Sequence, residues 1–183
     1  MPVRGHALFD TAIGRCGIAW GPLGLTAVQL PESNDAGTLR RLLKDVDGGE
    51  VVPEVPPLAA QAIAGIQALL RGERRALQEL PLDMSALTAF QRAVYALARN
   101  IPPGQTRTYG EVARELGDAR LARAVGQALG HNPFAPVVPC HRVLAAGNRP
   151  GGFSASGGTA TKMRMLAIEG AVLGDTLPLF ETG

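Results

Sequence analysis

The sequence predicts an α/β protein of the α+β type, with a small antiparallel sheet at the N-terminus and a mostly helical C-terminal part that contains a helix-turn-helix. Three observations predict this class. Short apolar segments alternate with glycine-containing turns over residues 7–30. From residue 88 onward, apolar residues recur at helical spacing instead. The 183 residues, 46% of them hydrophobic, are enough for one or two small domains.

The first third of the chain has the pattern of an antiparallel meander. Its strands are expected at residues 7–13, 16–20 and 25–30, with turns at Gly14-Arg15 and Gly21–Gly24. A short helix, a loop broken by three prolines and a longer helix are expected to follow, at residues 36–44, 48–57 and 58–70. Cys16 lies in an apolar strand, so we expect a buried, unreactive thiol there. No catalytic arrangement is visible in this region.

The second half begins with a well-marked helix. Thr88 and Gln91 stand at the spacing of a capping box, and the helix must end near Asn100 because Pro102 and Pro103 cannot continue it. The change from a strand-containing to a helical pattern predicts two domains, at residues 1–83 and 84–183.

Positive charge is concentrated in the second half. Residues 1–86 carry 8 basic and 10 acidic side chains, whereas residues 87–165 carry 10 basic and 3 acidic ones. An excess of this size is expected of a surface that binds phosphates. A solvated basic face would have the same composition, so charge alone does not decide between the two.

Two short helices follow, at residues 108–116 and 119–129, joined by a tight turn at Gly117-Asp118. This pattern fits a helix-turn-helix, although a helical corner in a core would have the same spacing. Four arginines between residues 107 and 123 favour nucleic acid as the partner.

The second of these helices is built from small residues, with Arg123 as the long side chain in its middle. The small residues are Ala119, Ala122, Ala124, Gly126 and Ala128. Such a helix lets its backbone approach DNA closely, while a single long side chain can insert into the base stack, as minor-groove proteins do. We therefore expect minor-groove binding that is independent of sequence and distorts the DNA.

Several classes of protein are excluded by composition. No apolar run reaches the roughly 18–20 residues needed to cross a bilayer, and the first six residues do not form a secretory signal. A cytoplasmic, membrane-free location is expected. Two cysteines, at positions 16 and 140, are too few for a disulfide framework or a four-thiolate zinc site. If either cysteine has a function, it acts as a thiol.

Cys140 is the candidate nucleophile. Prolines at 133, 136 and 139 predict an extended, stiff segment that holds Cys140 in a fixed place. A thiol reacts as the thiolate, and the adjacent His141 and Arg142 are groups of the kind that lower a thiol pKa. A carboxylate should orient the imidazole. The downstream candidates are Glu169, at the end of a helix expected at 161–168, and Asp175.

The pentapeptide Pro139-Cys140-His141-Arg142-Val143 stands in a longer pattern. Gly130-x-Asn132-Pro133 precedes it, and a glycine-rich loop and Glu169-Gly170 follow. In this order the motifs resemble those of the O6-alkylguanine-DNA alkyltransferases, also called methylated-DNA–protein-cysteine methyltransferases. The resemblance covers about residues 88–174.

The resemblance implies a catalytic role for five residues. Cys140 matches the cysteine that accepts the alkyl group irreversibly, and His141 matches the histidine that takes its proton through a water. Glu169 matches the acid that orients the histidine, and Asn132 matches the asparagine that ties the segment before the nucleophile to the helix-turn-helix. Tyr109 matches the tyrosine that contacts the flipped guanine and can donate a proton to it.

The resemblance also implies how DNA is bound. Arg123 matches the arginine that fills the gap left in the duplex when the base is flipped, and Ala122, Gly126 and Tyr109 would lie against the DNA. The partner would be double-stranded DNA containing O6-alkylguanine, with O4-alkylthymine as a second candidate substrate. The protein would act once, as a monomer, with no metal and no cofactor.

The base pocket implied by the resemblance includes Val143, Phe153 and a serine. Family members often have an aromatic residue followed by Ser-Gly-Gly, with lysine seven positions after that aromatic residue. Here Phe153 precedes Lys162 by nine positions, so two residues are inserted. Ser154 keeps the spacing from Cys140, while Ser156 keeps the spacing to Lys162. Either serine could therefore meet the base.

Two other functions are compatible with parts of the pattern. Alkyltransferase-like proteins bind alkylated DNA without repairing it, but they replace the cysteine, commonly by tryptophan, and this chain keeps Cys140. A cysteine hydrolase could use Cys140, His141 and Glu169, but it would leave Arg123 and the basic helix-turn-helix without a purpose.

Overall fold

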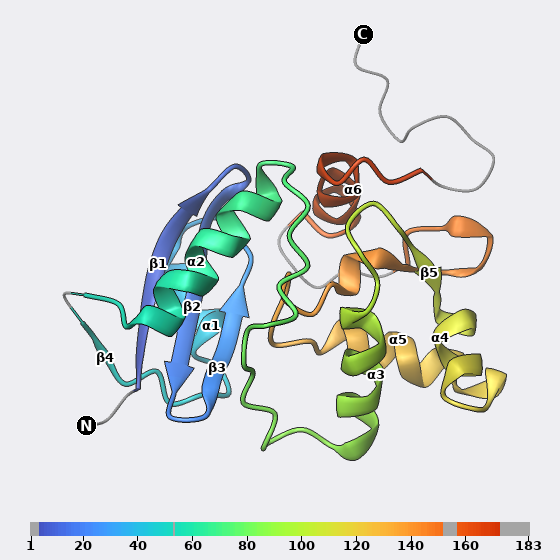
Figure 1. Cartoon of the computed structure of the whole chain (residues 1–183), viewed down its shortest axis with the longest axis horizontal. Coiled ribbons are helices and arrows are strands. Elements are labelled where there is room, and N and C mark those ends of the chain that lie inside the picture. The colour runs from blue at the N-terminus through green and yellow to red at the C-terminus, as the bar shows by residue number, and fades with distance from the viewer. Residues whose placement is uncertain (1–3, 53, 152–156, 173–183) are drawn as a thin grey trace, which may run out of the picture.

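The computed structural model describes residues 4–52, 54–151 and 157–172. A four-stranded sheet and two helices form the N-terminal part, and the remaining helices form the C-terminal part beside it (Figure 1). The α+β class predicted from the sequence is confirmed. In the part of the chain that the structure describes, no helix combines the length and apolar character that a membrane span requires.

The sheet contains the predicted meander. Its strands are β1 (Gly5–Thr11), β2 (Gly14–Gly21) and β3 (Gly24–Gln29), which pair antiparallel in the order β3-β2-β1. A two-residue strand, β4 (Glu50–Val51), pairs parallel with β1. The prediction of a plain loop at 48–57 is therefore wrong at β4, because Gly5 and His6 of β1 pair with it and β4 becomes the edge of the sheet.

Helices cover both faces of the sheet. The helix α2 (Pro57–Leu70) begins with proline at its first position, where the missing N–H costs nothing, and packs Ile66 and Leu69 into the main core. The helix α1 (Asp35–Leu42), capped by Asn34, packs Leu42 against the opposite face of the sheet. Both helices lie within two residues of their predicted bounds.

The C-terminal part begins with α3 (Ala89–Arg99), where the predicted capping box is present. The Thr88 hydroxyl accepts from the Gln91 N–H at 3.1 Å, and the Gln91 side chain accepts from the Thr88 N–H at 3.0 Å. The helix ends at its C-cap, Asn100, as predicted. One face of α3 is buried at Val94, Tyr95 and Ala98.

The helix-turn-helix consists of α4 (Tyr109–Glu115) and α5 (Ala122–Gly130). The second helix was expected to start at Ala119, but Ala119–Leu121 form a separate 3-10 turn. The Asp118 side chain accepts from the Arg120 N–H at 2.9 Å, which stabilises this turn instead of an α-helical start.

Three features of the C-terminal part position the site. A parallel pairing that the sequence did not predict joins β5 (Arg107–Thr108) to β6 (Val143–Leu144). Two 3-10 turns flank β6, at Cys140–Arg142 and Ala146–Asn148. The last helix, α6 (Thr159–Ile168), begins two residues before its predicted start.

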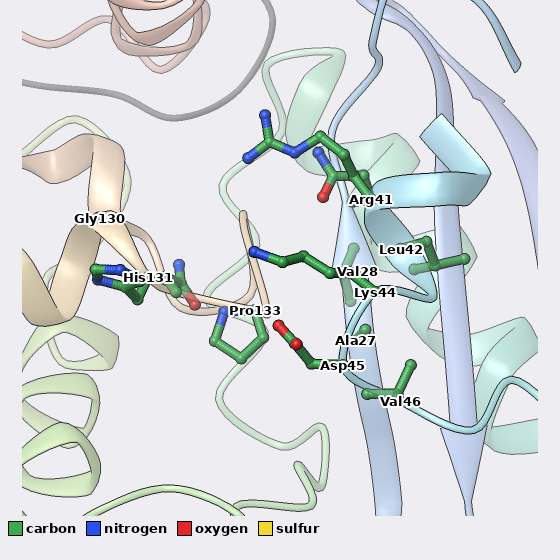
Figure 2. A pocket seen from close by; sticks show the side chains of 12 residues that line it. Ala27, Val28, Arg41, Leu42, Lys44, Asp45, Val46, Gly130, His131 and Pro133 are labelled. Carbon is green, nitrogen blue, oxygen red and sulfur yellow. The ribbon is translucent and has the colours of Figure 1, made fainter. Parts of the chain in front are cut away.

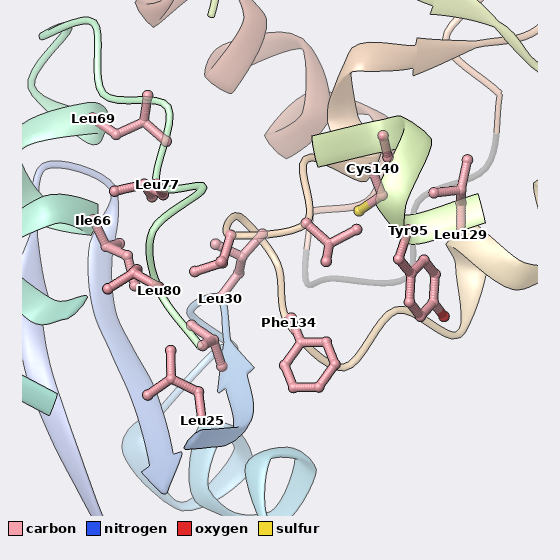
Figure 3. Packing of buried hydrophobic residues seen from close by; sticks show 14 of the residues in the cluster. Leu25, Leu30, Ile66, Leu69, Leu77, Leu80, Tyr95, Leu129, Phe134 and Cys140 are labelled. Carbon is pink, nitrogen blue, oxygen red and sulfur yellow. The ribbon is translucent and has the colours of Figure 1, made fainter. Parts of the chain in front are cut away.

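One hydrophobic core extends through both parts of the molecule. Figure 3 shows Leu25 and Ile66 of the N-terminal part in the same cluster as Tyr95, Leu129 and Cys140. Because the core is continuous, packing does not mark a boundary, and the division at residues 83 and 84 stays a prediction.

The thiol of Cys16 belongs to this core and is fully buried, as predicted. Burial raises its pKa to about 12, against a smaller opposing effect of the hydrogen bond with Thr11. Such a thiol stays protonated at neutral pH and is unreactive.

Candidate active site and DNA-binding groove

Cys140 is the first residue of a 3-10 turn, and the segment before it is folded on itself. The Val138 N–H donates to the Phe134 carbonyl at 3.1 Å, and the Cys140 N–H donates to the Val138 carbonyl at 2.8 Å. The prediction of an extended segment from Pro133 to Cys140 is therefore wrong. The three prolines restrict the backbone, but short-range hydrogen bonds between the remaining residues fold it into turns.

Asn132 holds this segment together. Its amide nitrogen donates to the Val138 carbonyl at 2.8 Å, and its amide oxygen accepts from the Phe134 N–H at 2.9 Å. Asn132 lies two residues after the end of α5 and so ties the end of the helix-turn-helix to the residues before Cys140. This is the contact that the resemblance implies for an asparagine at this position.

His141 and Glu169 form a buried pair. The His141 Nε2 atom lies 2.7 Å from a Glu169 carboxylate oxygen. Burial lowers the pKa of His141, and the nearby Glu169 only partly opposes this, so the imidazole is neutral at neutral pH. A neutral imidazole that donates from Nε2 keeps its free electron pair on Nδ1. No hydrogen bond joins the buried Nδ1 atom to any of the described residues.

Glu169 also binds Arg142, whose side chain is buried. The Arg142 Nε and Nη2 atoms donate to the two carboxylate oxygens at 2.9 and 2.7 Å, and Nη1 donates to the Ile101 carbonyl at 2.7 Å. Burial alone would raise the pKa of Glu169, but His141 and Arg142 together lower it to about 2. The guanidinium therefore holds the carboxylate, in contrast to the expectation that it would act on the thiol.

Arg142→Met should destabilise the protein by about 3–5 kcal/mol, because it leaves the charge of Glu169 buried without its bidentate partner. The pKa of Glu169 lies below its ordinary value of 4.5, so the carboxylate stabilises the wild type above that pH. This contribution is lost as the pH falls from 4.5 to about 2. The variant should lose less stability over this range. Urea unfolding as a function of pH measures both effects.

Arg120→Met is the matched control. It removes an arginine from an exposed ion pair with Asp118, 3.0 Å long. Exposed pairs contribute little to stability, so no measurable change is expected. Equal stability losses in the two variants would contradict the role given to the buried pair.

Lys162 is a site residue that sequence reasoning missed. Its ammonium group donates to the Val143 carbonyl at 2.7 Å and lies 5.7 Å from the centre of the Tyr109 ring. Burial lowers the pKa of Lys162 to about 8, with Cys140 opposing this shift. A signal was present in the sequence: Lys162, Met165, Leu166 and Glu169 recur at helical spacing, which places two charges on the buried face of α6.

Burial raises the pKa of the Cys140 thiol, because the charged form is desolvated. A hydrogen bond from Asn132 and the charge of Lys162 oppose this shift. The groups that favour the thiolate are therefore Asn132, Lys162 and the backbone N–H groups of Cys140 and His141, and not the adjacent Arg142.

Tyr109 begins α4 beside the cysteine. The Thr108 hydroxyl caps this helix by accepting from the Glu111 N–H at 3.1 Å, and Thr108 itself pairs with Leu144 of β6. This pairing brings the start of the helix-turn-helix next to the segment that carries Cys140. Burial, followed by the nearby Cys140, raises the pKa of Tyr109, so its hydroxyl stays protonated and able to donate.

The ring of Tyr109 packs closely against two glycines. A side chain at Gly126 of α5 would lie 3.7 Å from the ring, and one at Gly151, which has a φ of +71°, would overlap the hydroxyl. Gly151 therefore has two reasons to be glycine, its backbone conformation and the space that Tyr109 occupies.

A groove of about 1040 Å³ runs between the two helices of the helix-turn-helix. It brings together the four residues predicted to contact DNA, which are Tyr109, Ala122, Arg123 and Gly126. Arg123 is exposed, and Ala122 and Gly126 are half-buried, whereas Ala128 belongs to the core. Arg114 of α4 adds a second basic side chain to the lining.

Val143 is the residue of the predicted base pocket that lies within the described part of the chain. Val143 is buried, and its carbonyl accepts from Lys162. Phe153, Ser154 and Ser156 lie outside the described residues, so the choice between the two serines stays open.

Comparisons with known proteins agree with this geometry. Residues 89–171 match the family model described as 6-O-methylguanine DNA methyltransferase, DNA binding domain. A methylated-DNA–protein-cysteine methyltransferase of Mycolicibacterium paratuberculosis is 41% identical over 128 residues, 70% of this chain and 75% of that protein. A DNA base-flipping protein of Thermus thermophilus is 41% identical over 115 residues, 63% of this chain and 76% of that protein.

The fold agrees as well. The structure resembles the crystal structure of Mycobacterium tuberculosis OGT in complex with DNA with a TM-score of 0.70 and 31% identity, covering 90% of this chain and 92% of the other. The likeness thus includes the N-terminal sheet, which lies outside the residues on which the resemblance in sequence motifs was based. By sequence identity, coverage and fold, this chain belongs to the family of the methylated-DNA–protein-cysteine methyltransferases.

Proposed function

We propose that this protein repairs DNA by transferring the alkyl group of O6-alkylguanine to its own Cys140, in one irreversible turnover. The observation that carries the proposal is the position of Cys140. The same turn carries His141, which is paired with Glu169. Cys140 also lies near Tyr109, which lines the basic groove. O4-alkylthymine is a second candidate substrate. A cytoplasmic location remains part of the proposal.

His141 acts as the base that removes the thiol proton. Glu169 is ionised at neutral pH and accepts from Nε2, so the free electron pair lies on Nδ1. Nδ1 takes the proton of Cys140 through a water molecule, as the resemblance implies. The positive charge of Lys162 then stabilises the thiolate that forms.

The thiolate attacks the alkyl carbon, so that an S–C bond forms while the C–O6 bond breaks and its electron pair stays on guanine. Tyr109 donates a proton to the guanine ring, which makes the base a better leaving group. The proton taken up by His141 replaces the one lost by Tyr109, so the transfer is neutral overall. The resulting thioether is stable, which explains a single turnover.

The target carbon lies inside the duplex, so the base must leave the stack before it reaches Cys140. In this proposal, α5 lies in the minor groove, where Ala122 and Gly126 allow a close approach and Arg123 occupies the gap left by the flipped base. The protein acts as a monomer on double-stranded DNA.

The test is a mass measurement. After incubation with duplex DNA containing O6-methylguanine, the peptide that carries Cys140 should gain one CH2 unit, because a methyl group replaces the thiol hydrogen. Uptake should stop at one methyl group per protein molecule. An unchanged mass in the presence of binding to the same DNA would favour the alternative of a non-catalytic binder of alkylated DNA, since the relatives include a DNA base-flipping protein.

Arg123→Ala should slow repair of duplex DNA by about tenfold or more, yet leave transfer from the free base O6-benzylguanine unchanged. The side chain offsets unstacking of the duplex, which the free base does not require. Second-order rate constants for the two substrates measure this difference.

The control for Arg123 is Arg120→Ala, which removes the same charge from a side chain already paired with Asp118. It should weaken duplex repair much less. If Arg123→Ala slowed both substrates equally, Arg123 would act on the chemistry or the fold and not on the duplex.

A further inference from the structure

The edge strand β3 is hydrogen-bonded to later parts of the chain at two points. Near its start, the Leu25 N–H donates to the Pro81 carbonyl at 2.9 Å, and the Leu25 carbonyl accepts from the Asp83 N–H at 2.8 Å. Near its end, the Val28 N–H donates to the Pro133 carbonyl at 2.8 Å. The second contact joins the N-terminal sheet to the segment that leads to Cys140.

The contact at Val28 extends the sheet by one short pairing. Val28 and Phe134 form a parallel bridge, and the Phe134 side chain is buried in the core. Figure 2 shows Val28 and Pro133 on the two sides of the cleft between the N-terminal and C-terminal parts. In Figure 3, Phe134 lies between Leu25 of β3 and the region of Tyr95 and Cys140.

A series of hydrogen bonds connects this pairing to the nucleophile. The Asn132 side chain bonds the Phe134 N–H and the Val138 carbonyl. The Val138 N–H donates to the Phe134 carbonyl, and the Cys140 N–H donates to the Val138 carbonyl. Prolines at 133, 136 and 139 have no N–H, so the segment offers few backbone donors of its own. The bonds within the segment fix its shape, so its place relative to the N-terminal sheet depends on partners outside it.

We infer that the Val28 N–H is a positioning group for alkyl transfer, and that β3 fixes the place of Cys140 through Pro133 and Phe134. The N-terminal sheet then affects the rate of alkyl transfer, through the position of Cys140, as well as the stability of the fold. A displacement of a nucleophile by about 1 Å can slow a reaction by about a hundredfold, so a support of this kind matters for rate.

Val28→Pro tests the inference. Proline removes the N–H that bonds Pro133 but none of the bonds between β2 and β3, because this N–H points away from β2. Val28→Ala is the control, since it loses buried side-chain volume but keeps the N–H. Leu25→Pro is a second control that removes the equivalent bond to Pro81.

The readout compares the two cysteines. Iodoacetamide labelling, followed by peptide mass analysis, measures how often Cys140 and Cys16 become accessible. In Val28→Pro, labelling of Cys140 should be about fivefold faster or more than in Val28→Ala and in Leu25→Pro, as expected for the loss of one buried hydrogen bond. Labelling of Cys16, which is buried in β2, should not differ.

The rate of repair by Val28→Pro should fall, whereas the rate of Cys140 labelling should rise. Methyl transfer by Val28→Pro should be at least about fivefold slower than by Val28→Ala, although its thiol is more accessible. Equal labelling of Cys140 in the two variants, or parallel increases at both cysteines, would overturn the inference. Only the repair measurement rests on the proposed function: a wild type that takes up no methyl group would remove that function, while the labelling result would stand.

A measurement on the wild type keeps the inference testable if Val28→Pro does not fold. The Val28 N–H and the Cys140 thiol should become accessible in the same opening event. Hydrogen exchange of that N–H and labelling of that thiol should then give opening constants that agree within about threefold, with the same dependence on urea. Rapid exchange at Val28 with a protected Cys140 would show that the two are not linked.

Discussion

Cys140→Ala will take up no methyl group from DNA containing O6-methylguanine, whereas Cys16→Ala will take up one methyl group per molecule. The two cysteines are both buried, so burial does not distinguish them. Burial raises the pKa of both thiols, but the groups that oppose this shift at Cys140 include the charge of Lys162 as well as a hydrogen bond from Asn132, whereas at Cys16 a hydrogen bond with Thr11 opposes it. Mass analysis of the intact proteins after incubation separates the two outcomes.

Binding should survive the loss of the thiol. Cys140→Ala leaves the groove between α4 and α5 intact, including Tyr109 and Arg123. We therefore expect this variant to bind an alkylated duplex with about the affinity of the wild type, within about threefold. Methyl uptake by Cys140→Ala, or its loss in Cys16→Ala, would contradict the assignment of the acceptor.

His141→Gln should slow methyl transfer by about 10²- to 10⁴-fold, the usual contribution of a general base. Glutamine can still donate a hydrogen bond to Glu169, so the buried carboxylate keeps a partner and the fold should be retained. What is lost is the nitrogen that takes the thiol proton. The rate constant of methyl transfer, measured with protein in excess over DNA, gives the size of the effect.

The dependence on pH distinguishes this role from a structural one. Burial raises the pKa of Cys140, so without a base only the small thiolate fraction reacts. The rate of His141→Gln should then rise by about tenfold for each pH unit between pH 6 and the thiol pKa, while the wild type changes much less. A variant that is slow but keeps the wild-type pH profile would show that His141 only supports the fold.

Local sequence patterns predicted most of the elements. The meander and the capping box at Thr88 depend on residues within a few positions of each other, and both are present as predicted. The two short helices are present as well, although the second begins three residues later than predicted. The errors have two causes. The strand β4 forms because the distant strand β1 lies beside it. The segment before Cys140 folds because of side-chain and backbone hydrogen bonds within it, such as the one between Asn132 and Val138, which residue type and spacing did not reveal.

Some residues of the candidate site were predicted from the sequence, and others were found only in the structure. Motif order and resemblance nominated Cys140, His141 and Glu169 before any geometry was known, and the structure brings the last two to 2.7 Å. Lys162 was missed because its role depends on α6 packing against Val143. Arg142 was placed beside the thiol on adjacency alone, yet its guanidinium lies on Glu169.

The sequence by itself determined the order of the elements, the basic character of the second half and the presence of one thiol in a reactive setting. Composition, periodicity and short motifs depend only on neighbours along the chain, so they can be read directly. The tertiary structure alone decided which buried charges pair, how β5 meets β6 and how β3 supports the nucleophile. Those contacts join residues far apart in sequence, and they depend on how whole elements pack and exclude water.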